Sequence, residues 1–225
     1  MLTREFLQKA DCRTSFGIIE ERLLLTPQQR QASLNHTLAE RPDNCPVWVF
    51  GYGSLMWNPV FDADEICLAT LNGWHRTFCL RLTSGRGTAT HPGRMLALEP
   101  GGNTTGLAFR LPEATMREEL ELLWKREMVT GCYRPQWCSL DLHGGDTVTA
   151  LAFVTEPAHP LVEKDTCIQH IAPLIACASG PLGTNAQYLF SLEQELKNYG
   201  MSDEELYELA RQVRLLQQRD AAPGE

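Results

Sequence analysis

The sequence has no run of about 18 apolar residues, the length that a helix needs to cross a membrane. Its first residues, Met-Leu-Thr-Arg-Glu, lack the charged and then apolar order of a signal peptide. No Cys-x-x-Cys pair occurs, and the six histidines show no spacing typical of metal ligands. We therefore expect neither a membrane span nor a secretion signal, and we predict no metal site.

Positive charge is also scarce, with 20 Lys and Arg residues against 28 Asp and Glu residues and a net charge of −8. This balance argues against nucleic acid or an anionic membrane surface as a partner. Eight cysteines are scattered along the chain, several in apolar runs such as Ile66-Cys67-Leu68, where buried reduced thiols are ordinary. Reduced thiols indicate a cytoplasmic protein.

The most informative stretch is Val47–Leu55, in which an apolar run ends in two glycines that flank a tyrosine. Val47–Phe50 has the pattern of a buried strand. Gly51 and Gly53 allow the backbone to approach another group closely, and successive bare N–H groups in such a turn suit a carboxylate or an oxyanion. A tight turn at a strand end would also account for these glycines. The pattern therefore indicates an anion cradle or a plain turn.

Two familiar motifs are excluded in this stretch. A dinucleotide-binding fingerprint needs a third glycine where this chain has Met56. A nucleophile elbow needs glycines two residues before and after Ser54, where this chain has Tyr52 and Met56. The stretch therefore predicts neither a dinucleotide cofactor nor a serine nucleophile.

The second informative stretch is a predicted amphipathic helix, Glu113–Thr130. Leu120 and Leu123 belong to an apolar stripe that faces the core, and Glu127 falls in line with that stripe. A buried carboxylate is costly unless it is paired or protonated. Burial raises its pKa, so that it can exchange a proton near neutral pH. A salt bridge with Arg126 or with a distant arginine is the alternative interpretation.

Together these stretches resemble the ChaC family of γ-glutamylcyclotransferases, which acts on glutathione. The family's substrate loop, Phe-Gly-Tyr-Gly-Ser-Leu, stands unbroken as Phe50–Leu55. The family's catalytic segment, Arg-Glu followed by Gly-x-Tyr, is matched by Arg126, Glu127, Gly131 and Tyr133. Further landmarks in the same order are Gly73–Arg76, Arg86–Thr88, Pro92–Arg94, Gly180–Asn185 and Tyr188–Leu189.

The resemblance runs from about Val47 to about Tyr199 and has two departures. Cys132 stands where many relatives have a second glycine, and residues 1–44 extend beyond the short members of the family. The first departure bears on the flexibility of the turn. The second leaves the N-terminal segment without an assigned role. Neither departure removes a residue that the resemblance assigns to the chemistry.

The resemblance implies cleavage of glutathione by its own α-amino group. This amine attacks the γ-glutamyl side-chain carbonyl and closes a five-membered lactam, which gives 5-oxoproline and Cys-Gly. No metal, cofactor or enzyme nucleophile is needed, and Cys132 is not expected to be catalytic. Glu127 would act as general base and then as general acid. The expected partner is the small-molecule substrate glutathione, and the sequence does not identify a protein partner.

The resemblance also implies a substrate site around the glycine loop. The loop's backbone N–H groups would bind a carboxylate or the developing oxyanion. Tyr52 and Ser54 would contact the substrate, although a packed ring and a turn-forming hydroxyl are open alternatives. Arg76 and Arg94 are candidates for the glycine carboxylate, and Tyr188 would line the pocket or belong to the core. The predicted substrate-binding residues are Gly51, Tyr52, Gly53, Ser54, Leu55, Met56, Arg76 and Tyr188.

We expect three parts along the chain: an N-terminal helical extension (1–44), a catalytic domain (45–218) and a tail (219–225). Strands that come first and helices that follow argue for an α+β fold. The resemblance implies a small mixed β-barrel flanked by helices. The predicted strands are Val47–Gly51, Ile66–Leu71, Thr77–Leu82, Met95–Glu99, Gly106–Arg110, Gln136–Leu140 and Thr147–Val154. Hairpin turns are predicted at 100–103 and 143–146, and late helices at about 165–178, 185–199 and 203–218.

Two other functions remain open at this point. One is cyclotransferase activity on other γ-glutamyl amides, and the other is a non-catalytic regulatory protein that binds a metabolite or a partner. A glutamate at position 127 favours catalysis over the regulatory role. The Arg86–Thr88 and Pro92–Arg94 landmarks favour glutathione over other γ-glutamyl amides.

Overall fold

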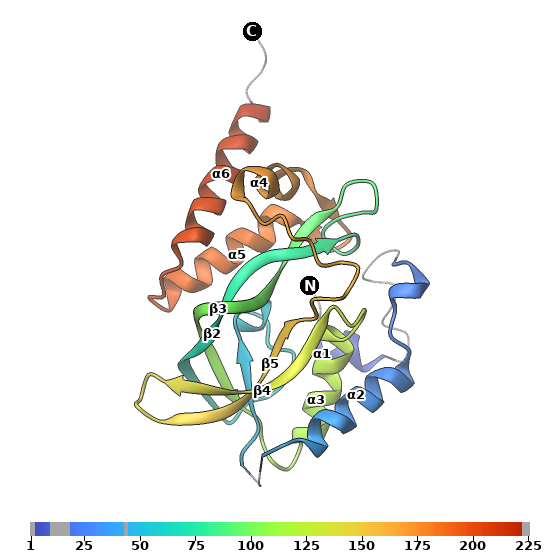
Figure 1. Ribbon diagram of the computed structural model, residues 1–225, viewed down its shortest axis with the longest axis vertical. Coiled ribbons are helices and arrows are strands. Elements are labelled where there is room, and N and C mark those ends of the chain that lie inside the picture. Colours follow the sequence, from blue (N-terminus) through green and yellow to red (C-terminus); the bar gives the residue numbers. More distant parts are fainter. Residues whose placement is uncertain (1–2, 10–18, 43–44, 222–225) are drawn as a thin grey trace. The chain divides into compact units, whose positions relative to one another are not determined.

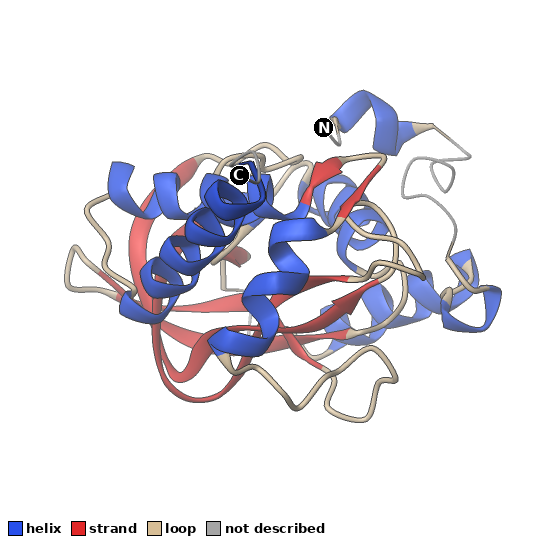
Figure 2. Cartoon of the chain, turned by 90° about the horizontal axis from the view of Figure 1, so that it is seen from above, coloured by secondary structure: helices blue, strands red, loops and turns tan. Residues whose placement is uncertain are grey.

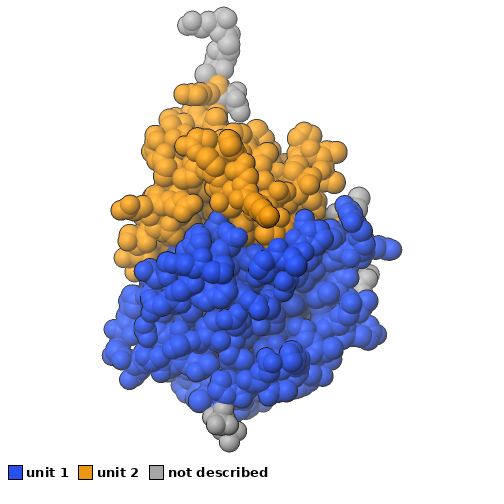
Figure 3. All heavy atoms as spheres, in the orientation of Figure 1, with its two compact units in different colours: residues 1–12, 20–77, 97–160 blue, residues 13–19, 78–96, 161–225 orange. Residues whose placement is uncertain are grey.

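The computed structural model describes residues 3–9, 19–42 and 45–221. The chain divides into two compact units, which Figure 3 shows in different colours. The first unit comprises residues 1–12, 20–77 and 97–160, and the second comprises residues 13–19, 78–96 and 161–225. The predicted catalytic domain, 45–218, is therefore distributed over both units.

Five strands form a closed barrel in the order β1-β3-β2-β4-β5. β1 is antiparallel to β3 and parallel to β5, so the barrel is mixed, and the predicted α+β barrel fold is confirmed. Every residue of β1 is buried, as its apolar sequence predicts. The strands are β1 (Trp48–Gly51), β2 (Glu65–Leu82), β3 (Gly93–Arg110), β4 (Tyr133–Leu142) and β5 (Thr147–Thr155).

The hairpin predicted at 143–146 is confirmed, and the one predicted at 100–103 is wrong. β4 and β5 pair continuously on either side of the first turn, where Gly145 has a φ of 100°. Residues 100–103 lie inside β3 instead, and the two strands predicted on each side form one 18-residue strand. The predicted strands 66–71 and 77–82 are likewise joined in β2.

Irregular backbone in the middle of β2 and β3 explains why each of these long strands continues as one strand and does not fold back into a hairpin. Gly101 and Gly102 of β3 have φ angles of 114° and 63°, which L side chains rarely adopt. Opposite them, Thr104 Oγ1 donates to the carbonyl of Trp74 at 2.9 Å, and His75 Nδ1 lies 3.3 Å from the carbonyl of Gly101. Glycines of this kind mark bulges as readily as turns, and the neighbouring strand decides which one forms.

The helical elements of the first unit include three that precede the barrel and one that follows β3. α2 begins at Pro27, where Thr26 and Gln29 form a capping box. α1 and α2 contact α3, as Figure 1 shows. α3 is shorter than predicted, and Glu127 is its last residue. These elements are α1 (Arg4–Gln8), η2 (Glu21–Leu23), α2 (Pro27–Ala39), η3 (Ser54–Met56) and α3 (Met116–Glu127).

The second unit is built on three helices that pack against one another, as the sequence predicts. Figure 2 shows these helices in blue. The elements are α4 (Ile168–Cys177), the short strands β6 (Ser179–Gly180) and β7 (Gly183–Thr184), α5 (Asn185–Asn198) and α6 (Glu204–Ala221). α6 continues past the predicted domain end at 218, and residues 222–225 of the predicted tail lie outside the described residues.

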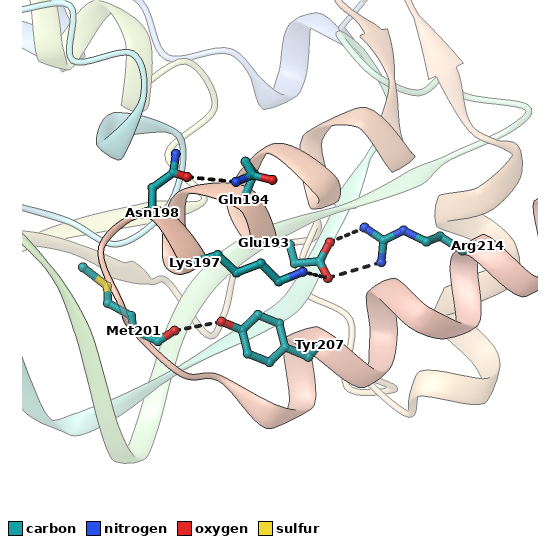
Figure 4. A network of polar contacts seen from close by, with 7 residues as sticks. All are labelled: Glu193, Gln194, Lys197, Asn198, Met201, Tyr207 and Arg214. Carbon is teal, nitrogen blue, oxygen red and sulfur yellow. Dashed lines mark hydrogen bonds and ion pairs between the residues drawn. The ribbon is translucent and has the colours of Figure 1, made fainter.

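A buried carboxylate joins α5 to α6. Glu193 of α5 accepts from Lys197 at 2.9 Å and forms an ion pair with Arg214 of α6 (Figure 4). Tyr207 donates to the carbonyl of Met201 at 2.7 Å in the link between the two helices. None of the helices in the described ranges is both long and apolar enough to span a membrane.

The N-terminal extension is anchored to α3 by a second buried carboxylate. The guanidinium of Arg4 donates to both oxygens of Glu119, at 2.5 and 2.8 Å, and the N–H of Asp62 donates to the same carboxylate at 3.1 Å. Glu119 is 1% exposed. Burial opposes ionisation of Glu119, but the hydrogen bonds from Arg4 and Asp62 outweigh burial and hold its pKa below the usual 4.5.

We predict that Arg4→Ala lowers the free energy of unfolding by about 2 kcal/mol, because it leaves the buried Glu119 carboxylate without its cation. This is below the usual cost of breaking a buried pair, since the Arg4 side chain is 34% exposed. The stabilisation is present above the unfolded pKa of Glu119 and is lost as the pH falls through its lowered folded pKa.

Urea unfolding at neutral pH measures the difference. Arg22→Ala is the matched control, because it breaks the Arg22–Glu20 pair, whose side chains are 75% and 60% exposed. Such a pair contributes less than about 1 kcal/mol. Equal effects of the two substitutions would contradict the prediction.

Candidate active site

The glycine loop follows β1 directly and is packed into the barrel. A Cβ on Gly51 would lie 2.8 Å from the ring of Phe109, and a Cβ on Gly106 would lie 2.4 Å from the carbonyl oxygen of Gly51. Both distances are shorter than real Cβ contacts, so only glycine fits at either position. Packing therefore suffices to explain Gly51, whether or not the loop binds an anion.

Two buried side chains hold the loop in place through hydrogen bonds to backbone carbonyls. The hydroxyl of Tyr52 donates to the carbonyl of Phe153 at 2.5 Å, and Arg76 Nε donates to the carbonyl of Tyr52 at 2.7 Å. Arg76 also donates to the carbonyl of Thr105. Tyr52 and Arg76 are 7% and 8% exposed. These contacts position the loop, while direct contacts of Tyr52 and Arg76 with a substrate stay predictions.

The remaining loop residues differ in burial. Gly53, Leu55 and Met56 are buried, and the N–H of Met56 donates to the carbonyl of Gly53 at 2.9 Å. Ser54 is the one residue of the loop 51–56 that is partly exposed. Its hydroxyl oxygen accepts a hydrogen bond from Arg126, which has no acceptor, so the hydroxyl proton is not used in this contact.

Arg126 joins the loop to the end of α3. Its Nη2 donates to Ser54 Oγ at 2.8 Å, its Nη1 donates to the carbonyl of Asn58, and its Nε lies 3.0 Å from Glu127 Oε1. The Arg126 side chain is 5% exposed. The structure shows the Arg126–Glu127 salt bridge that the sequence offers as the alternative interpretation, and it adds contacts with Ser54 and Asn58 that the sequence does not predict. Adjacent residues on a helix do not normally face each other. The contact forms because the helix ends at Glu127.

Glu127 is a largely buried carboxylate at the end of α3, on the stripe that the sequence predicts to face the core. Its side chain is 16% exposed, and burial raises its pKa above the usual 4.5. Arg126 opposes this shift in part through its charge and its hydrogen bond. Glu119 lies on the same helix with a lowered pKa. Of these two carboxylates, Glu127 is therefore the one suited to exchanging a proton near neutral pH.

Cys132 lies in the turn after Glu127 and is 3% exposed. Burial raises the pKa of its thiol to about 11. A thiol with this pKa stays protonated at neutral pH and is a poor nucleophile. The expectation that Cys132 is not catalytic is consistent with this environment.

Three of the sequence landmarks meet in the second unit. The side-chain amide of Asn185 accepts from the N–H of Arg94 at 2.7 Å and donates to the carbonyl of Arg94 at 2.8 Å. A Cβ on Gly93 would lie 2.4 Å from Asn185 Oδ1. Arg86 Nη1 donates to the carbonyl of Thr184 at 2.9 Å. Close backbone packing accounts for these landmarks.

Tyr188 also belongs to the second unit. It lies on α5, and its ring packs edge-on against Phe78 with centroids 6.2 Å apart. Glu127, Arg76 and the loop 51–56 belong to the first unit. Tyr188 as a pocket residue therefore stays a prediction. Within the described part of the chain, no group of three or more His, Cys, Asp and Glu side chains is arranged to hold a metal ion.

Comparison with known proteins identifies close relatives. The model of the family described as ChaC-like protein matches residues 47–216. The glutathione-specific γ-glutamylcyclotransferase of Escherichia coli (strain K12) is 65% identical over 216 residues, covering 96% of this chain and 94% of that protein. The γ-glutamylcyclotransferase 2-1 of Arabidopsis thaliana is 34% identical, covering 75% of this chain and 82% of that protein.

A solved structure shares the fold. The selenomethionine-labelled γ-glutamyl cyclotransferase specific to glutathione from yeast matches with a TM-score of 0.73 and 22% identity, covering 80% of this chain and 100% of that chain. At this identity the match bears on the fold alone. The predicted resemblance and the predicted barrel fold are both confirmed.

We predict that Glu127→Gln stabilises the protein at pH 8. A folded-state pKa above the unfolded value means that the folded state binds the proton more tightly, so stability falls as the pH rises through the folded pKa. The neutral amide avoids this loss. Thermal unfolding from pH 4.5 to pH 8.5 should show a higher Tm for the variant at pH 8 and a smaller difference near pH 4.5.

Glu121→Gln on the same helix is the control, because Glu121 is 45% exposed and pairs loosely with Arg117 at 3.6 Å. This variant should follow the pH dependence of the unsubstituted protein. A Glu127→Gln variant that is less stable than the unsubstituted protein at pH 8 would contradict the prediction.

Proposed function

This chain belongs to the ChaC-like protein family, and we propose that it is a glutathione-specific γ-glutamylcyclotransferase. The observation that carries the proposal is the contact of Arg126 with both Glu127 and Ser54, which holds a proton-exchanging carboxylate beside the glycine loop. The printed names of its relatives support glutathione as the substrate.

The proposed reaction is an intramolecular transfer. The α-nitrogen of the γ-glutamyl residue forms a bond to its own side-chain carbonyl carbon, and the amide bond from that carbon to the cysteine nitrogen breaks. The products are 5-oxoproline and Cys-Gly. The α-nitrogen loses two protons as its ammonium group becomes the lactam N–H, and the cysteine nitrogen gains two as it becomes the ammonium group of Cys-Gly. No water is consumed, because the attacking nucleophile is the amine. Holding the reacting atoms in contact can contribute about 7–11 kcal/mol to lowering the barrier.

Glu127 serves as the proton carrier in this scheme. An α-amino group has a pKa of about 8 and is mostly protonated at neutral pH, so a base is required. The raised pKa of Glu127 brings its basicity closer to that of the amine. The same carboxyl group, once protonated, delivers the proton to the leaving amine.

The loop 51–56 binds the γ-glutamyl group in this scheme. The N–H of Met56 is used within the loop, so the cradle draws on the N–H groups that precede it. The hydroxyl proton of Ser54 is free to donate to the substrate because its oxygen accepts from Arg126. One donor aimed at a developing oxyanion in a dry site is worth about 3 kcal/mol in the transition state.

We also propose a reducing compartment, the cytoplasm, as the location of the protein. Seven cysteines among the described residues are free, and Cys45, Cys167 and Cys177 are exposed. Exposed thiols persist in the cytosol, where glutathione and thioredoxin keep them reduced.

We expect Glu127→Gln to lower kcat by about 10²–10⁴-fold, because the amide keeps the shape of the side chain and removes the proton acceptor. The assay follows 5-oxoproline and Cys-Gly by mass spectrometry, first with reduced glutathione and then with γ-glutamyl amino acids. Glu121→Gln should retain full activity. A protein that forms no 5-oxoproline from any γ-glutamyl compound would overturn the proposed function, and turnover of all substrates alike would overturn the specificity.

Arg126→Met and Arg126→Lys separate the two effects of this arginine. Arg126 lowers the pKa of Glu127, so its neutral replacement should raise that pKa and move the acidic limb of the kcat/KM profile to higher pH. Lysine keeps the charge and loses the planar fork, so the limb should stay in place while kcat falls by about tenfold. If both variants kept the kcat and the kcat/KM pH profile of the unsubstituted enzyme, the contact between Arg126 and Glu127 would have no role in catalysis.

A further inference from the structure

The N-terminal extension lies along α3 in antiparallel order. Arg41 pairs with Glu113 before the helix, and Asn35 accepts from Arg117 at 2.6 Å near its start. Ser33 accepts from Trp124 Nε1 at 3.2 Å, one turn before the end of the helix. The N–H of Leu25 donates to the carbonyl of Val129 at 2.9 Å, just beyond Glu127. These contacts place Leu25 at the Glu127 end of α3, and they place α2 farther back along the helix.

Leu25 contacts the turn after Glu127 with its side chain as well as its backbone. Gly131 has a φ of 74°, and a Cβ at this position would lie 3.3–3.4 Å from three side-chain atoms of Leu25. The Leu25 side chain therefore packs directly over this glycine. Arg30 Nη1 donates to the carbonyl of Leu25 at 2.7 Å, which holds Leu25 from the other side.

A later segment holds the same turn at two further carbonyls. His159 Nε2 lies 3.0 Å from the carbonyl oxygen of Thr130, and the N–H of Glu156 donates to the carbonyl of Cys132 at 2.9 Å. With the bond from Leu25, the turn is bound at three of its carbonyls. Because Glu127 is the last residue of α3, a shift of this turn would move the end of the helix and the Glu127 carboxylate with it.

We propose that Leu25 is a positioning residue for Glu127, and that the N-terminal extension thereby takes part in catalysis. This inference rests on the proposed function. It assigns a role to a segment that lies outside the family match of residues 47–216. Leu25 acts through the turn: its amide fixes Val129, and its side chain covers Gly131. Because this turn follows Glu127 directly, we expect loss of the Leu25 side chain to open Glu127 to water and to weaken the burial that raises the pKa of that carboxyl.

The test compares Leu25→Ala with Leu34→Ala in the full-length protein. Leu25 is half-buried, whereas Leu34 is 1% exposed on the part of α2 next to Ser33 and Asn35. The two substitutions remove the same atoms from one segment. For Leu25→Ala we expect a kcat about 10- to 100-fold lower, since small displacements of reacting groups cost this much, with little change in KM and only a small loss of Tm.

The control should give the opposite order of effects. Leu34→Ala should lower the Tm more than Leu25→Ala does, because it empties a deeply buried site, and should leave kcat unchanged below the unfolding range. The acidic limb of the kcat/KM profile should move to lower pH in Leu25→Ala, because a wetter Glu127 has a lower pKa, and should stay in place in Leu34→Ala. Leu25→Met, which refills the space, should restore kcat and the profile.

The outcomes separate this inference from the proposed function. An unsubstituted protein that makes no 5-oxoproline from glutathione overturns the proposed function. An active unsubstituted protein whose Leu25→Ala variant keeps its kcat and pH profile overturns the positioning role alone. Parallel losses of kcat and Tm in Leu25→Ala and Leu34→Ala, with unmoved pH profiles, would also overturn it, because they would show a purely structural effect.

Discussion

The proposed site depends on the contacts of the Arg126 guanidinium with Ser54, Asn58 and Glu127. The guanidinium joins a loop and a helix end whose contacting residues, Ser54 and Arg126, are 72 positions apart in the chain. Three donors in one plane reach a hydroxyl, a carbonyl and a carboxylate at the same time, which a lysine ammonium on a flexible stem would not reproduce. The same group also limits how far burial raises the pKa of Glu127. One side chain therefore contributes to both the geometry and the acidity of this site, although burial has the larger effect on the pKa.

Local patterns were sufficient for several parts of the structure. The apolar run before Gly51 predicted β1, and the turn 143–146 predicted the β4–β5 hairpin. The stripe on α3 predicted that Glu127 would be buried, because helical periodicity alone decides which face a residue occupies. The prediction of the barrel depended on the family resemblance, because no local sequence pattern shows how five strands pair to close a barrel.

Features that depend on distant partners were not predicted. The glycines at 101 and 102 fit a hairpin and a bulge equally well, and the opposite strand decides between them. The ion pair of Glu119 needs Arg4, which lies 115 residues away in a helix with no recognised role. The contact of Leu25 with the turn after Glu127 likewise joins segments about 100 residues apart. No sequence pattern in either segment predicts that the two are in contact.

The packing of Gly51 bears on how the glycine loop should be used to identify enzymes among relatives of this protein. Gly51 is required by the ring of Phe109, and Gly106 is required by the carbonyl oxygen of Gly51 and the ring of Phe50. A family member that had lost its chemistry would still need both glycines in order to fold. Gly51 is therefore a mark of the fold, whereas Arg126 and Glu127 at the end of α3 belong to the proposed reaction. Under the proposed mechanism, the arginine–glutamate pair would be a better criterion for active relatives than the first glycine of the loop.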